Sequence, residues 1–177
     1  LCATQEPSWM SPYTTALLTA WMNYGDKVRE YPQGRYPGGG NAAYRKEVFD
    51  RVGLFNTELG RKGNLLLASE EKDIFDKMKA LGMKVLYLPT PVLHHSIPQS
   101  KLEEDYFNRL TLQIGRSERM RTRAISKGKY LSRLASEAVK WGGTLALLCI
   151  YALQGAPKKG WKLVLFRRNV TKGLFGG

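Results

Sequence analysis

The side chains that could take part in chemistry are concentrated in three short segments of this 177-residue sequence. They are Gly-Gly-Gly-Asn-Ala-Ala-Tyr-Arg at residues 38–45, two glutamates at residues 70–71, and two histidines at residues 94–95. Glycines let a backbone approach a ligand closely, and the amide of Asn41 can donate to or accept from a hydroxyl group. Carboxylates and imidazoles can accept protons or bind metal ions. These residue types suit a site that binds a hydroxylated ligand and moves a proton.

The two glutamates also have a purely structural interpretation. Ser69 is the predicted N-cap of a helix over residues 70–81, which places both carboxylates in its first turn. Acidic side chains at that end stabilise a helix because they complement its dipole. Neighbouring residues of a helix point about 100° apart, so only one of the two could face a cleft squarely. The pair by itself therefore leaves both roles open.

The elements that must position these residues alternate between helix and strand. The helix predicted over 70–81 ends at Gly82, and a strand predicted over 84–88 follows at once. One face of that helix is apolar and consists of Ile74, Phe75, Met78 and Leu81. Further helices are predicted over 13–24, 45–52 and 102–119. A helix that leads directly into a strand is typical of an α/β fold.

Four segments, in order along the chain, together resemble the family 2 glycosyltransferases of the GT-A fold. They are residues 38–45, 52–55 and 69–74, followed by Tyr-Leu-Pro at 87–89 and the two histidines. In that family a Gly-x-Asn-x-Ala-x-Arg segment lines the acceptor site, an acidic pair opens a helix that ends in Gly, and a strand leads through a Pro to a His. Each motif alone is unspecific, but the four in this order are specific. The resemblance covers residues 30–120.

The resemblance implies an α/β fold, with residues 1–120 as the acceptor-side, C-terminal part of a GT-A domain. It also implies that Glu71 is the catalytic base and that Glu70 takes the supporting position. In these enzymes a carboxylate deprotonates the acceptor hydroxyl as it attacks the anomeric carbon of a nucleotide sugar, opposite the leaving diphosphate, which inverts the configuration. The commoner pair is Glu-Asp, so the longer side chain of Glu71 must be accommodated here.

Binding roles follow from the same resemblance. Gly39, Gly40 and Asn41 match the segment that lines the acceptor site, although a tight turn that enters a strand would also explain the glycines. Arg45 could contact a phosphate or pair with Glu70, and the residues do not decide between these partners.

A metal site is implied only in part. His95 matches the histidine that joins an Asp-x-Asp motif in holding Mn²⁺ or Mg²⁺ against the leaving diphosphate, although a hydrogen-bonded loop histidine is the alternative. This sequence contains no Asp-x-Asp and begins with Leu1 rather than Met. We therefore expect the main metal ligands and the nucleotide-binding half to lie outside this chain, which would be inactive alone.

Positive charge is concentrated in the C-terminal part of the chain. The net charge is +13, and residues 101–177 contain 16 lysines and arginines against 5 acidic residues. Basic stretches of this kind bind phosphates, either of nucleic acid or of an anionic membrane. The uncharged run at 141–156 would span only about 24 Å as a helix, short of the roughly 30 Å hydrocarbon core. We expect residues 121–177 to form a basic, partly apolar helical tail that lies on a membrane or packs on the core.

The expected protein is therefore a glycosyltransferase at the cytoplasmic face of a membrane. Its partners would be a nucleotide-sugar donor, a glycan or lipid-linked acceptor and an anionic lipid surface, and not nucleic acid. The two cysteines, far apart and without metal-type spacing, favour a reducing compartment. A basic nucleic-acid-binding module would leave the acidic pair and the Gly-Asn segment unexplained. A non-catalytic structural subdomain would keep the fold but would not use Glu71 or His95.

Overall fold

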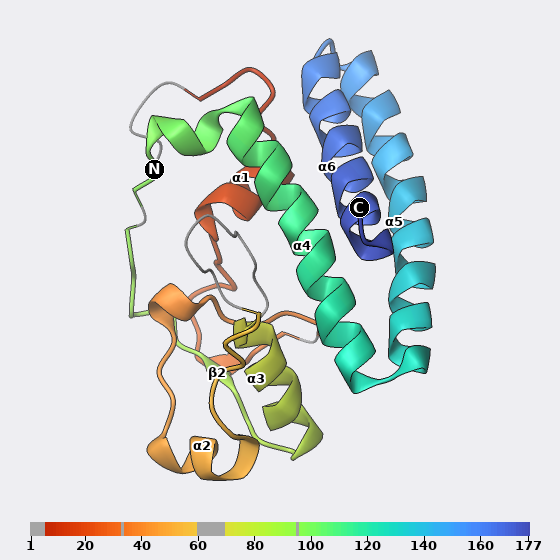
Figure 1. Cartoon of the computed structure of the whole chain (residues 1–177). Coiled ribbons are helices and arrows are strands. Elements are labelled where there is room, and N and C mark those ends of the chain that lie inside the picture. The colour runs from red at the N-terminus through yellow and green to blue at the C-terminus, as the bar shows by residue number, and fades with distance from the viewer. Residues whose placement is uncertain (1–5, 33, 60–69, 95) are drawn as a thin grey trace.

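The computed structural model describes residues 6–32, 34–59, 70–94 and 96–177. This part of the chain is mostly helical, and its sheet consists of two short strands (Figure 1). The α-helices are α1 (Pro12–Thr19), α2 (Lys46–Val52), α3 (Glu70–Ala80), α4 (Glu104–Ile125), α5 (Lys127–Leu153) and α6 (Pro157–Phe175). Two 3₁₀-helices, η1 (Gly39–Asn41) and η2 (Gln99–Leu102), and the strands β1 (Arg29–Glu30) and β2 (Leu86–Tyr87) complete the described elements.

The three long helices lie side by side, with α6 packed against both α4 and α5 (Figure 1). Two glycines allow α4 and α6 to approach closely. A Cβ at Gly115 would collide with the carbonyl oxygen of Val170, and a Cβ at Gly173 would collide with the carbonyl oxygen of Leu112. The two backbones are therefore in direct contact, and α6 is an integral part of the fold rather than a loosely attached tail.

The main hydrophobic core joins the N-terminal segment to α4. Its buried members are Met10, Leu18, Ile97, Leu102, Phe107 and Leu110. Trp9 packs on Phe107 with ring centroids 5.7 Å apart, and Phe166 of α6 borders the same cluster. The core thus lies between α1, the segment before α4, and the helices α4 and α6.

Helix α3 and strand β2 follow one another as predicted. The buried residues of α3 are Ile74, Phe75 and Met78, and the helix ends before Gly82, whose φ is +68°. Strand β2 pairs antiparallel with β1, with Arg29 opposite Tyr87. The coarse expectation of helices with a sheet holds, but the described residues contribute only these two strands to it.

Several predicted boundaries were wrong for local reasons. Helix α1 stops at Thr19 rather than at residue 24, because Ala20 adopts a left-handed conformation with φ 51°. Strand β2 is shorter than the predicted 84–88, and β1 was not predicted. The helix predicted over 102–119 begins later and extends to Ile125, and the basic and uncharged parts of the tail form one continuous helix, α5. Among the described helices, none combines the length and the apolar character needed to cross a membrane.

Candidate functional site

The acidic pair and the glycine-rich segment meet in the structure. Glu71 lies in the first turn of α3, and its Oε1 accepts a hydrogen bond from the backbone N–H of Gly39 at 3.0 Å. A Cβ on residue 39 would collide with that oxygen, so any larger residue here would force the carboxylate of Glu71 to move. The hydrogen bond fixes one oxygen of the Glu71 carboxylate against η1.

The same segment contacts the other two motifs. The side-chain amide of Asn41 donates to the carbonyl oxygen of Pro91 at 2.9 Å, which ties η1 to the loop after β2. The ring of Tyr44 lies 5.8 Å from that of Phe55, in the Val-Gly-Leu-Phe segment. The four predicted motifs therefore converge on residues 38–45.

The charge of Glu71 affects the pKa of two tyrosine hydroxyls, those of Tyr36 and Tyr44. Burial raises the pKa of Tyr44, and the Glu71 carboxylate raises it further. Burial also raises the pKa of Tyr36, and the charges of Glu118 and Glu71 raise it further. Both phenols therefore stay neutral near pH 7 and can donate. Within the described residues, the buried Tyr44 hydroxyl has no hydrogen-bond partner.

Sequence reasoning missed both tyrosines. Tyr44 lies inside the glycine-rich segment, but the sequence does not indicate where the hydroxyl of an aromatic loop residue points. Tyr36 precedes that segment, and only the fold brings it near Glu118 on α4.

Arg45 lies in a different region from Glu71. It precedes the first residue of α2 and lines a cavity of about 460 Å³ together with Arg51, Met78 and Lys84. Met78 belongs to the C-terminal half of α3, whereas Glu71 is in its first turn. Binding of a phosphate by Arg45 remains a prediction, and it would take place beside two further cations and the carboxylate of Glu47.

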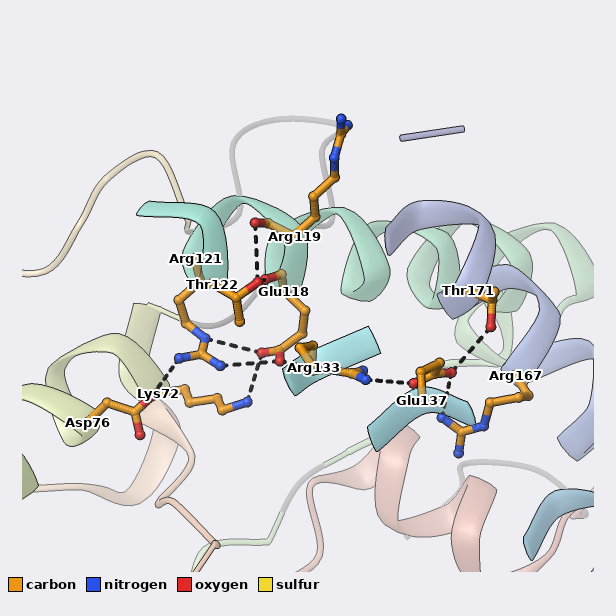
Figure 2. Close-up of polar contacts among 10 residues, drawn as sticks. All are labelled: Lys72, Asp76, Glu118, Arg119, Arg121, Thr122, Arg133, Glu137, Arg167 and Thr171. Carbon is orange, nitrogen blue, oxygen red and sulfur yellow. Dashed lines mark hydrogen bonds and ion pairs between the residues drawn. The ribbon is translucent and has the colours of Figure 1, made fainter. Parts of the chain in front are cut away.

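The helix that carries Glu71 is held by a buried ionic network (Figure 2). Lys72 Nζ donates to Glu118 Oε1 at 2.8 Å, and Arg121 donates to both oxygens of Glu118 at 3.2 Å. Arg121 also donates to Asp76 on α3, at 2.5 Å. Arg133 of α5 donates to Glu118 Oε2 at 3.1 Å. Residues Lys72 and Asp76, one turn apart, thus fix α3 on α4.

The pKa of Glu118 is lowered from 4.5 to about 2. Burial alone would raise it, but the charges and hydrogen bonds of Lys72 and Arg121 outweigh that effect. Burial lowers the pKa of Lys72, and Glu118 opposes this shift. The carboxylate is therefore ionised and paired at neutral pH.

The network continues into the helical hairpin formed by α5 and α6. Arg133 Nη1 donates to Glu137 Oε2 at 2.7 Å, and Arg167 of α6 donates to Glu137 Oε1 at 2.9 Å. Thr171 donates to the same oxygen at 3.3 Å (Figure 2). A chain of charged contacts therefore runs from α3 through α4 and α5 to α6.

The predicted metal ligand His95 lies outside the described residues, and His94 is exposed. Within residues 6–32, 34–59, 70–94 and 96–177, no group of three His, Cys, Asp or Glu side chains is arranged to hold a metal ion. These residues by themselves do not fit a Mn²⁺ or Mg²⁺ site.

Comparison with known proteins gives no relative. No family model, curated protein sequence or solved structure matches the chain.

Proposed function

We propose that this chain is the acceptor-side part of an inverting glycosyltransferase of the GT-A type, related to family 2. It would transfer a sugar from a nucleotide-sugar donor to a hydroxyl of a glycan or lipid-linked acceptor. The observation that supports this most is the hydrogen bond from Gly39 to Glu71, because it joins the acidic pair to the segment that resembles an acceptor loop. The contacts of Asn41 and Tyr44 bring the remaining two motifs to the same place.

In the proposed mechanism Glu71 is the general base. Gly39 holds Oε1, so Oε2 is the oxygen that takes the proton of the acceptor hydroxyl. The hydroxyl oxygen forms a bond to the anomeric carbon while the bond from that carbon to the leaving diphosphate breaks. The donor and most ligands of a divalent metal would be held by residues outside this chain.

Two adjacent glycine variants test this proposal in the full-length enzyme. Gly39→Ala places a Cβ against Glu71 Oε1, whereas a Cβ at Gly38 meets only Met22 Cε, at 3.6 Å. We expect Gly39→Ala to lower turnover by about 10²-fold, the size of effect that a displacement of about 1 Å can have on catalysis. Gly38→Ala should stay within a few-fold of wild type. Transfer rates and melting temperatures of both variants are the measurements, and equal rates would contradict the proposed role of the contact.

We further propose that the α5–α6 hairpin contacts the cytoplasmic face of an anionic membrane. Several large apolar side chains of these helices are exposed, among them Val139, Leu145, Leu153, Trp161 and Phe175. They are accompanied by exposed cations such as Lys127, Lys129, Lys158 and Arg168. Apolar insertion combined with basic side chains is what binds a helix to an anionic interface.

The membrane contact is tested with exposed residues rather than with a truncation, because α6 is part of the core. The variant Leu153→Gln/Trp161→Gln removes side chains that are 89% and 57% exposed. We expect about tenfold weaker sedimentation with phosphatidylglycerol vesicles, since full burial of one such side chain contributes about 1.5–3 kcal/mol. The matched control is Leu54→Gln/Trp21→Gln, at positions that are 76% and 66% exposed but distant in sequence from the hairpin. Equal losses in both variants would rule out the hairpin as the contact.

A further inference from the structure

A second cavity, of about 260 Å³, lies between α1 and the α5–α6 hairpin. Its walls are mainly hydrocarbon, supplied by Leu17 of α1, Leu147 of α5, and Leu163 and Phe166 of α6. Leu17 and Phe166 also pack against the main core, which holds these two wall residues in place. A cavity with apolar walls is suited to an apolar ligand rather than to water.

The neutral polar groups at this cavity offer few hydrogen-bond partners to a neutral polar ligand. The Thr14 hydroxyl donates to the carbonyl oxygen of Ser11 at 3.0 Å, and the Thr144 hydroxyl donates to that of Lys140 at 2.9 Å. Both threonines line the cavity, but their hydroxyl protons are already used. Apart from the hydroxyl of Tyr13, which also lines the cavity, a neutral polar ligand would find few hydrogen-bond partners here.

Two cations also line the cavity, Lys140 and Arg167. Arg167 pairs with Glu137, but the described residues place no carboxylate within ion-pair distance of Lys140. Burial lowers the pKa of Lys140, the positive charges of Arg133 and Arg167 lower it further, and Glu137 opposes this. Positive charge therefore exceeds negative charge beside the apolar walls, and a bound anion would compensate for the excess.

We propose that this cavity binds one molecule of an anionic lipid, with its phosphate between Lys140 and Arg167 and part of its hydrocarbon chain against Leu147 and Phe166. The proposal rests on the hairpin's contact with a membrane for its supply of lipid, and it is independent of sugar transfer. Leu145 and Ile150 are exposed on the same turns of α5 that contribute Leu147. The site therefore lies within the segment that would contact the membrane.

Two neighbouring glycines of α5 provide the first test. A Cβ at Gly142 or at Gly143 meets nothing within 4 Å, but only Gly143 lines the cavity. Leucine at either position gains the same helix propensity, while Gly143→Leu fills the cavity. The probe is a short-chain phosphatidylglycerol kept below its micelle concentration and titrated into the full 177-residue chain by calorimetry. We expect one molecule per chain for wild type and Gly142→Leu, and at least about tenfold weaker binding for Gly143→Leu.

A charge-matched pair provides the second test, which does not depend on how well the cavity accepts leucine. Lys140→Gln and Lys27→Gln remove one positive charge each from exposed positions, but only Lys140 lies on the hairpin and lines the cavity. We expect about fivefold to tenfold weaker lipid binding for Lys140→Gln, as for loss of one charge-assisted contact, and no change for Lys27→Gln. Phosphatidylcholine of equal chain length and inorganic phosphate should both bind far more weakly.

Each possible result has a defined meaning. Equal binding by the two leucine variants, or by phosphatidylcholine and phosphatidylglycerol, would overturn the site. Tight binding of inorganic phosphate would make it a site for a free anion and would also overturn the proposal. If the short-chain lipid binds with the expected pattern but the hairpin does not sediment with vesicles, the membrane contact fails and the lipid site stands. Glu71→Gln should leave this titration unchanged, which separates it from the transferase proposal.

Discussion

Replacing Glu71 with glutamine is expected to lower the rate of sugar transfer in the full-length enzyme by about 10²–10⁴-fold. An acceptor hydroxyl is a poor nucleophile, and glutamine cannot take its proton. The substitution keeps size and polarity, and its amide oxygen can still accept the hydrogen bond from Gly39. The loss should therefore appear in turnover, with little change in donor affinity, because the base contacts the acceptor rather than the nucleotide.

Glu70→Gln is the matched control for this experiment. Glu70 lies in the same first turn of α3, is also partly buried, and carries the same side chain. We expect a smaller effect on turnover and a larger one on stability or acceptor affinity. Near-normal turnover of Glu71→Gln with an inactive Glu70→Gln would show that the base is the other member of the pair. Full activity of both variants would show that the two glutamates stabilise the helix N-terminus and take no part in catalysis.

Local patterns predicted the elements that surround Glu71 well. The apolar spacing of Ile74, Phe75 and Met78, with Gly82 after them, predicted α3 to within one residue at its C-terminal end. Such patterns work because they record which face of a helix is buried and where the backbone must turn. They could not show that Gly39 contacts Glu71, since the order of motifs along a chain does not define their distance in space.

Charge counting did not show which cations of the tail are exposed and which are buried. The excess of lysine and arginine predicted a surface for phosphates, but Arg121 and Lys162 are buried and paired with carboxylates inside the fold. Lys162 donates to Glu104 at 2.6 Å and lies over the rings of Trp9 and Phe107. A composition counts charges without their partners, so it cannot separate cations that bind a ligand from cations that hold helices together.

The buried network is the basis of the second large expected effect. Glu118→Gln removes the negative charge that Lys72, Arg121 and Arg133 share, and leaves these cations buried with too little compensation. Breaking a buried ion pair in this way typically destabilises a protein by about 3–5 kcal/mol. We expect a loss of that size at pH 7, measured by urea denaturation with tryptophan fluorescence. The matched control is Asp105→Asn on the same helix, whose exposed pair with Arg109 should contribute less than about 1 kcal/mol.

The same variant gives a pH dependence with a defined sign. The pKa of Glu118 is lowered to about 2 in the folded protein, from an ordinary value of 4.5. Its contribution is fully present above the unfolded value and is lost as the pH falls through the folded value. A shift of this size corresponds to about 3 kcal/mol. The difference in stability between wild type and Glu118→Gln should therefore be constant from pH 7 to about 5 and should shrink toward zero near pH 2. A constant difference down to pH 2 would mean that lost packing, and not lost charge, causes the destabilisation. No difference at pH 7 would mean that desolvation cancels the attraction, and α3 would then be held on α4 by its apolar face alone.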